Sequence, residues 1–488
     1  MAGPTAYSTL ERAILHRLAE STGRAVDLAY ASIIHQLGIT PRFFAEGGFG
    51  DLRIVDFHEE LKSFQSWPPE HFDDVKIDWR RVREDNYNGH AYTVLRANFP
   101  TLTRSPAYDA MPIESRTAHA LWIVPHQPAT GSPTAIHLAA TGDHGFARRE
   151  HLSIPLIARG VGSIALESPF YGIRKPEEQQ GAKLRRVSDL ILLGKATIEE
   201  SLFLLQWLSL RGHTRLGVSG LSMGGVHASM VAALYPEPLA LAPLLAPRSA
   251  AQSYCQGALF HATAWDQLLR DTEGREAEIV AAVKEAAVAH EKMAAAKIRR
   301  DALEGRANSL GFSVAGVQNK DDQRLVAETS VGRAAAVAAV KENAQQQGHW
   351  AGVGRWMSDW GHSLENQIRK VRRLESINRG NATKASENHD RHAAAVLLLE
   401  AVLETFTDAT RFPCPRRPDA AVLVAATEDA YVSPQSVLDL HRHLPGSEIR
   451  WIPGGHVSSF LMHQPAFRNA IVDSLDKLNN NNNNSDFS

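Results

Sequence analysis

The chain has only two cysteines, Cys255 and Cys414, among its 488 residues, and it lacks a long hydrophobic run. Two cysteines cannot form a disulfide framework, which favours a reducing compartment. No apolar run reaches the ~18 residues that a membrane-spanning helix needs, and the N-terminus lacks the apolar region of a secretory signal. We therefore expect an intracellular protein that is not secreted, in the cytoplasm or in mitochondria.

The chain also lacks an excess of charge of one sign. Its 52 basic and 54 acidic residues nearly balance, whereas a dedicated nucleic-acid-binding protein usually carries a strong basic excess. The sequence contains no H-E-x-x-H motif, no paired C-x-x-C and no G-x-x-x-x-G-K phosphate loop. We therefore expect no nucleic-acid partner, no metal site and no cofactor, and the sequence does not indicate the oligomeric state.

A candidate nucleophile stands in the string Gly220-Leu221-Ser222-Met223-Gly224. It follows a short apolar run and precedes an apolar stretch rich in small residues, which predicts a strand, a tight turn and a helix. A Ser at the apex of such a turn projects its hydroxyl out of the sheet, and the flanking glycines tolerate the crowded backbone. The alternative is a Gly-rich surface turn with a solvated Ser.

Two downstream runs supply a candidate acid and base. The apolar run 421–426 is followed by Glu428 and Asp429, and the run 448–453 is followed by His456. Each polar group follows the carboxyl end of a predicted strand, where catalysis occurs in open α/β sheets. The order Ser, acid, His is the order of a hydrolase triad, so we predict Ser222, Asp429 and His456 as that triad, with Glu428 as the rival acid. Alone, Asp429 reads as a turn former and His456 as a loop histidine.

Acyl transfer also needs two donors aimed at the developing oxyanion. The residue after the nucleophile supplies one, the amide of Met223, and the loop after an upstream strand supplies the other. The predicted strand 134–140 is followed by Thr141 and Gly142, whose amides are the candidates. We expect the adjacent Asp143 and His144 to shape this turn rather than to act chemically.

Four cations near the predicted strand ends are candidates for binding a substrate phosphate: Arg148, Arg149, Arg174 and Lys175. The alternative is ion pairing with the nearby Glu150, Glu177 or Glu178.

Strand and helix patterns alternate from about residue 116 onward, which predicts a parallel sheet with crossover helices. The alternation stops between residues 250 and 410, where Ala, Glu, Lys and Arg recur at helical spacing. The predicted fold is α/β, with a mostly parallel central sheet, flanking helices and a large helical cap insertion.

The predicted division is 1–115, an N-terminal helical and irregular region; 116–249 and 411–478, the core; 250–410, the cap; and 479–488, a disordered Asn-rich tail. Before the insertion, strands are expected at 118–124, 134–140, 161–166, 215–219 and 239–245.

Several motifs together resemble the alpha/beta-hydrolase domain-containing protein 18 family over about residues 40–250 and 410–478. These are Met111–Ser115, Thr141–His144, Glu167–Gly172, Arg174–Pro176, the Ser222 turn, Glu428–Tyr431 and Gly454–His456. The resemblance implies an alpha/beta-hydrolase fold and a serine hydrolase acting on a lipid-type acyl ester, such as a phospholipid or cardiolipin-type substrate.

The predicted function is therefore cleavage of a carboxylic ester, and two alternative functions remain open. One is a catalytically idle fold that serves as a binding or scaffold protein, and the other is an acyltransferase that uses the same triad. Within the insertion, Trp350, Trp356 and Trp360 precede the basic cluster 369–373. This order is typical of peripheral contact with an anionic lipid surface, but the simpler interpretation is a cap helix whose Trp residues pack on the sheet and whose Arg residues are solvated.

Overall fold

The structure is a computed structural model that describes residues 22–31, 41–54, 68–126, 131–309 and 384–479. The chain divides into two compact units, which are described separately. The first contains residues 1–56, 67–283 and 402–488, and the second contains residues 57–66 and 284–401. The sheet and every candidate site residue of the described chain belong to the first unit.

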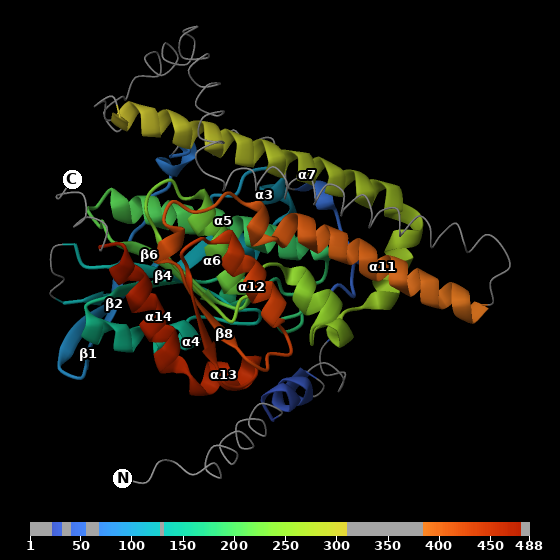
Figure 1. Ribbon diagram of the computed structural model, residues 1–488, viewed down its shortest axis with the longest axis horizontal. Coiled ribbons are helices and arrows are strands. Elements are labelled where there is room, and N and C mark those ends of the chain that lie inside the picture. Colours follow the sequence, from blue (N-terminus) through green and yellow to red (C-terminus); the bar gives the residue numbers. More distant parts are fainter. Residues whose placement is uncertain (1–21, 32–40, 55–67, 127–130, 310–383, 480–488) are drawn as a thin grey trace, which may run out of the picture. The chain divides into compact units, whose positions relative to one another are not determined.

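The first unit is built on a nine-stranded sheet in the order β1-β2-β3-β5-β4-β6-β7-β8-β9. Strands β1, β2, β4, β6 and β8 are labelled in Figure 1. Strands β5, β4, β6, β7, β8 and β9 are parallel to one another, and β1 to β3 form an antiparallel extension beside β5. The sheet is therefore mostly parallel, as predicted. The strands are β1 Arg80–Tyr87, β2 His90–Pro100, β3 Thr117–Pro125, β4 Thr134–Leu138, β5 Gly162–Leu166, β6 Leu216–Leu221, β7 Ala240–Leu244, β8 Val422–Ala426 and β9 Glu448–Ile452.

The central strands are buried on both faces. Every residue of β4, β5, β7 and β8 is buried, as expected for continuous apolar runs in a parallel sheet covered by helices on both sides. One face packs on α14 through Phe467, Ala470 and Ile471, together with Leu152 of α4. On the other face α6 approaches β6 so closely that a side chain on Gly220 would meet the backbone of Gly224 at 2.2 Å.

The helices of the described chain connect and cover these strands. Their bounds are α3 Ala107–Ala110, α4 Ala147–Ser153, α5 Val187–Ser209, α6 Met223–Leu234, α7 Trp265–Ser309, α11 Lys384–Thr407, α12 Pro434–His443, α13 His456–Met462 and α14 Gln464–Lys477. Residues 22–31 form a further helix. Among the described residues, none of the helices has both the length and the hydropathy that crossing a bilayer would require.

The antiparallel hairpin β1–β2 is a feature that we did not predict, since we expected no strand in residues 1–115. Strand β1 is almost wholly exposed, and its Arg and Glu side chains hide the usual apolar signal of a strand. The turn between the strands is Asn88-Gly89, and both residues have positive φ angles, 50° and 89°. This dipeptide favours the turn type that matches the twist of a hairpin.

The insertion between β7 and β8 is mainly helical where the structure describes it. It begins with the π-helical turn Gln252–Gln256 and continues into α7, and it returns through α11. Residues 310–383, which include the predicted membrane-docking Trp350, Trp356, Trp360 and the basic cluster 369–373, lie outside the described residues. That the insertion covers Ser222 remains a prediction.

Candidate active site

Ser222 occupies a strained turn between β6 and α6. Its backbone angles are φ 55° and ψ −118°, a region that non-glycine residues rarely adopt and that costs about 1–3 kcal/mol. The Ser222 amide donates to the carbonyl of Leu244 on β7, at 2.8 Å, and holds the turn against the sheet. Leu221, Ser222 and Met223 are partly exposed, whereas Gly220 and Gly224 on either side of them are buried. The turn therefore presents the Ser222 hydroxyl at the partly exposed apex of a buried strand–helix junction.

Two glycines allow this turn to form. A side-chain carbon on Gly224 would lie 2.4 Å from the carbonyl oxygen of Leu138, and one on Gly220 would lie 2.2 Å from the backbone of Gly224. Both contacts are with backbone, which cannot swing aside. The G-x-S-x-G spacing thus has a steric cause in this structure, as the elbow of a strand–turn–helix unit requires.

His456 and Asp429 lie in contact at the carboxyl ends of the neighbouring strands β9 and β8. Nδ1 of His456 lies 2.6 Å from Oδ2 of Asp429. The other carboxylate oxygen, Oδ1, accepts hydrogen bonds from the amides of Tyr431 and Val432, both at 2.8 Å. An ionised carboxylate only accepts, so Nδ1 carries the proton and Nε2 is left as the basic nitrogen.

The pair is well buried, with 13% of the His456 side chain and 2% of the Asp429 side chain exposed. Burial alone would lower the pKa of His456, but the charge and hydrogen bond of Asp429, together with the charge of Asp27, raise it above the ordinary 6.5. The Tyr431 ring lies beside the imidazole, with centroids 5.0 Å apart. Among the described residues, no hydrogen bond or ion pair joins the carboxylate of the rival acid Glu428 to His456, whereas Asp429 contacts it directly.

Within the described structure, no hydrogen bond joins Ser222 to His456. The structure therefore brings the predicted acid and base into contact and places the predicted nucleophile at the elbow, but it does not show the three as a closed chain of hydrogen bonds. Catalytic hydrogen bonds are often long in the absence of substrate and shorten only in its complex.

The candidate oxyanion donors lie at the start of α6 and in the loop after β4. The amide of Met223 is the first of α6, where no acceptor within the helix is in reach. In the loop after β4, Thr141 and Gly142 are both partly exposed. Both therefore remain candidates for the second donor.

The rest of the loop is shaped by Asp143 and His144, as expected. Asp143 forms a buried ion pair with Arg149, at 3.0 Å. His144 accepts a hydrogen bond from the amide of Gly172, at 2.9 Å, and its ring packs edge-on against Tyr171. Both side chains thus fix the loop after β4 against the segment after β5.

Two of the four candidate phosphate-binding cations are structural instead. Arg174 is fully buried and contacts Glu200 through both terminal nitrogens, at 2.7 and 2.8 Å. Arg149 contacts Asp143 and donates to the carbonyls of Leu166 and Gly145. Neither guanidinium can reach a substrate without breaking these contacts. The partners are not the neighbouring Glu residues that the sequence suggested, because the chain fold brings in more distant carboxylates.

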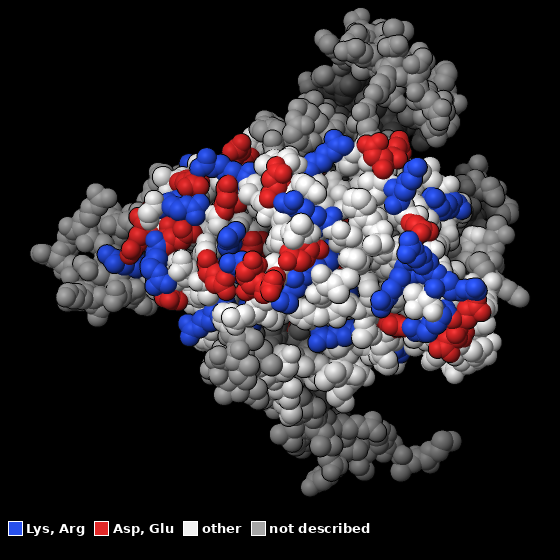
Figure 2. All heavy atoms as spheres, turned by 180° about the vertical axis from the view of Figure 1, so that it is seen from behind, with Lys and Arg blue, Asp and Glu red and all other residues white. Residues whose placement is uncertain are grey.

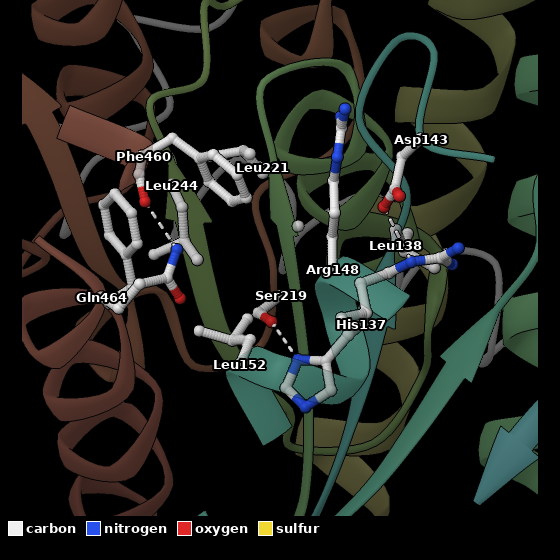
Figure 3. A pocket seen from close by; sticks show the side chains of 13 residues that line it. His137, Leu138, Asp143, Arg148, Leu152, Ser219, Leu221, Leu244, Phe460 and Gln464 are labelled. Carbon is white, nitrogen blue, oxygen red and sulfur yellow. Dashed lines mark hydrogen bonds and ion pairs between the residues drawn. The ribbon is translucent and has the colours of Figure 1, made fainter. Parts of the chain in front are cut away.

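The other two candidates, Lys175 and Arg148, differ in exposure. Lys175 is half-buried and donates to the carbonyl of Gln179, at 2.6 Å. Arg148 is exposed and lies at the edge of a pocket beside the elbow (Figure 3). Arg148 extends away from the pocket floor in that view. It is the one of the four that the described structure leaves available to a solvent-borne anion.

The floor of this pocket is formed by a buried histidine that the sequence did not single out. Nδ1 of His137 lies 2.6 Å from Ser219 Oγ, and Nε2 lies 3.0 Å from Ser163 Oγ, so the imidazole links three adjacent strands. Burial lowers the pKa of His137 to about 3. It is therefore a neutral structural group and not a second base.

The described residues contain no cluster of three His, Cys, Asp or Glu side chains placed to hold a metal ion. On the face of the molecule shown in Figure 2, basic and acidic side chains are interspersed rather than separated by sign. That face therefore offers no extended surface of one charge.

Comparison with solved structures finds distant likeness to proteins that include esterases and a hydrolase. An acetyl xylan esterase from Paenibacillus sp. R4 is 12% identical, with 86% of this chain and 96% of that chain covered and a TM-score of 0.37. A 2-hydroxy-6-oxo-6-phenylhexa-2,4-dienoate hydrolase from Rhodococcus sp. strain RHA1 is also 12% identical, with coverages of 80% and 96% and a TM-score of 0.35. At these values the matches do not bear on substrate or mechanism.

The family match is far more extensive. The family described as "Alpha/beta hydrolase domain containing 18" matches residues 41–477, which include the whole sheet, the Ser222 elbow, Asp429 and His456. This confirms the resemblance seen in the sequence, and the match also runs through the helical insertion. The chain therefore belongs to the alpha/beta hydrolase domain containing 18 family.

Proposed function

We propose that this alpha/beta hydrolase is a serine hydrolase that cleaves a carboxylic ester with Ser222, His456 and Asp429. The observation that carries the proposal is the bond of 2.6 Å between His456 and Asp429, located at strand ends next to a strained Ser elbow. A buried carboxylate that fixes one imidazole nitrogen leaves the other free to act on a hydroxyl. Either residue alone could be structural, but the elbow gives the pair a nucleophile to serve.

In this mechanism Ser222 Oγ attacks the ester carbonyl while Nε2 of His456 accepts its proton. Asp429 holds the imidazole orientation and stabilises the imidazolium. The amide of Met223 and the amide of Thr141 or Gly142 donate to the oxyanion. His456 then returns the proton to the leaving alcohol, and a water molecule, activated by the same imidazole, releases the acid from Ser222.

We further propose that the substrate is a lipid acyl ester. The family resemblance suggested it, and the element that carries the base adds an independent observation. Leu461 and Met462, in the last turn of α13, are 69% and 75% exposed. Large apolar side chains left in water beside a catalytic group are typical of a surface that meets apolar substrate or a lipid interface. Arg148 is a candidate contact for a phosphate of the head group.

The direct test is labelling with a fluorophosphonate probe, which reacts with an activated serine. Wild type should label, and Ser222→Ala should not, while both unfold at the same temperature. Equal labelling of Ser222→Ala would contradict the assigned nucleophile. No labelling of folded wild type would favour a binding or scaffold protein.

Two further measurements specify the reaction. Product analysis with an added alcohol separates hydrolysis from acyl transfer, because only a transferase forms the new ester. Untargeted lipid analysis of cells expressing wild type or Ser222→Ala identifies the head group and acyl chain, since the true substrate accumulates only with the inactive variant. An unchanged lipid profile would contradict a lipid substrate.

A further inference from the structure

A short helix near the N-terminus lies against the two loops that carry the acid and the base. Residues 22–31 are helical, and within this helix Gly23, Asp27 and Ala31 are buried, whereas the others are exposed. These positions are four residues apart, so they share one face of the helix. That face contains a glycine, a carboxylate and an alanine, and it therefore buries little apolar surface.

Asp27 is fully buried and accepts three backbone hydrogen bonds. Its Oδ2 accepts from the amides of Ala430, at 3.0 Å, and His456, at 2.6 Å. Its Oδ1 accepts from the amide of Val457, at 2.9 Å. Ala430 follows the acid Asp429 directly, and His456 is the base itself. One carboxylate thus joins the acid loop to the base loop.

The contact with His456 and Val457 also satisfies the start of α13. These residues supply the first two amides of the helix, which have no acceptor within it. The residue before them, Gly455, has no side chain to cap the helix. Asp27 supplies the missing acceptor from a segment more than 400 positions away in the sequence.

The close approach of the two segments depends on glycines on both sides. A side-chain carbon on Gly23 would lie 2.5 Å from the amide nitrogen of Gly455. One on Gly455 would lie 2.4 Å from the carbonyl oxygen of Gly23 and 2.6 Å from Oδ2 of Asp27. The glycine before the base therefore makes room for the carboxylate that holds it.

We propose that Asp27 is a positioning residue of the active site, which fixes the backbone of His456 relative to Asp429 and adds negative charge behind the imidazole. This inference rests on the proposed function, in which His456 is the base. Three N–H groups converge on the Asp27 side chain, and a carboxylate offers acceptors to all of them. An asparagine offers one oxygen, and its NH₂ group would face a donor, so it cannot reproduce the contact.

Besides positioning the backbone of His456, Asp27 also affects the pKa of its imidazole through its charge. Among the described residues, Asp429 and the ring of Tyr431 contact the His456 imidazole, and the Asp27 carboxylate contacts the His456 amide. Asp429 provides the larger charge effect on the pKa of His456, and Asp27 raises it further. The acidic limb of the pH–rate profile is the fall in rate as His456 becomes protonated. Loss of the Asp27 charge should therefore move this limb to lower pH, which loss of a purely structural contact would not do.

The experiment measures the rate of fluorophosphonate labelling of Ser222 against pH in the full chain. The variants are Asp27→Asn and Asp27→Ala, and the matched control is Arg24→Ala, an exposed residue of the same helix. Both Asp27 variants should label about 10- to 100-fold more slowly, as expected for a misplaced catalytic group, with the acidic limb at lower pH. The control should match wild type. Wild-type rates and an unchanged limb in the Asp27 variants would overturn the proposal.

Amide hydrogen exchange provides a readout that does not need activity. The amides of Ala430, His456 and Val457 should exchange faster in Asp27→Asn than in wild type, while the amides of the central strands stay protected. Unchanged exchange at all three would overturn the inference even if labelling were slow. If instead Ser222→Ala labelled like wild type, the proposed nucleophile would fail while the exchange result would still test the Asp27 contact.

Discussion

At the scale of single residues, the proposed triad makes a prediction that compares two adjacent carboxylates. Asp429→Asn keeps the shape of the side chain but can no longer hold His456 in the correct tautomer. By analogy with other triads, kcat should fall on the order of 10⁴-fold. Glu428→Gln is the matched control and should leave kcat within about twofold, as expected of a residue outside a unit whose members act together. Hydrolysis of a soluble chromogenic ester measures both, and the reverse result would make Glu428 the acid.

The raised pKa of His456 leads to a prediction about pH. The base must be neutral to accept the proton of Ser222, so the rate falls as pH drops through the pKa of the imidazole. Since this pKa lies above the ordinary 6.5, more than half of His456 should be protonated at pH 6.5. The labelling rate there should be less than half of its alkaline plateau. A rate still on the plateau at pH 6.5 would show that Asp429 and Asp27 do not outweigh burial.

Arg174 gives a prediction about stability rather than catalysis. Arg174→Met leaves the buried Glu200 without its cationic partner, although the hydroxyl of Thr101 still donates to it, and breaking a buried ion pair in this way costs about 3–5 kcal/mol. Urea denaturation should therefore show a markedly lower midpoint, whereas Lys175→Met, at a half-buried neighbour, should change the midpoint little. Wild-type stability of Arg174→Met together with lost activity would restore Arg174 as a substrate contact.

At the scale of elements, the sequence predicted the parallel part of the sheet well and its antiparallel edge poorly. The strands from Thr117 onward have apolar runs that end at turns, and the structure confirms them with bounds that differ by at most two residues. Strand β1 was missed because it is an exposed edge rich in Arg and Glu, although its Asn88-Gly89 turn was a usable signal.

The candidate site shows the same division between local and distant information. Ser222, Asp429 and His456 could be found because each follows a predicted strand with a typical motif. The burial of Arg149 and Arg174 could not, because it depends on Asp143 and Glu200 being brought to them by the fold. Asp27 carried no motif, since its partners are backbone amides far along the chain.

The exposed end of α13 leads to a prediction at this scale. If Leu461 and Met462 contact a lipid surface, the double Ser variant should lose about tenfold or more of its activity on ester presented in vesicles, because burying each apolar side chain contributes up to about 1.5–3 kcal/mol. Activity on a short soluble ester should be unchanged, since the triad is intact. Equal losses on both substrates would mean that these residues support α13 rather than bind lipid.

At the scale of the whole molecule, family membership spans the sheet and the helical insertion together. In the chain, the insertion lies between β7 and β8, which are neighbouring strands of the sheet. Its first turns contact the acid loop: Ser253 Oγ donates to the carbonyl of Tyr431, at 3.0 Å, and the amide of Ala258 donates to the carbonyl of Ala430, also at 3.0 Å. The start of the insertion, at Ser253 and Ala258, is therefore anchored to the loop that carries Asp429.

This anchoring gives the prediction that residues 250–410 supply most of the acyl-binding surface over Ser222. A fluorophosphonate whose alkyl chain carries a photoreactive diazirine would first label Ser222 and then, on irradiation, cross-link to whatever surrounds the chain. Peptides from 250–410 should dominate the cross-links found by mass spectrometry, and Ser222→Ala should give none. Cross-links confined to the core segments 116–249 and 411–478 would mean that the acyl chain lies along the sheet and that the insertion serves another purpose.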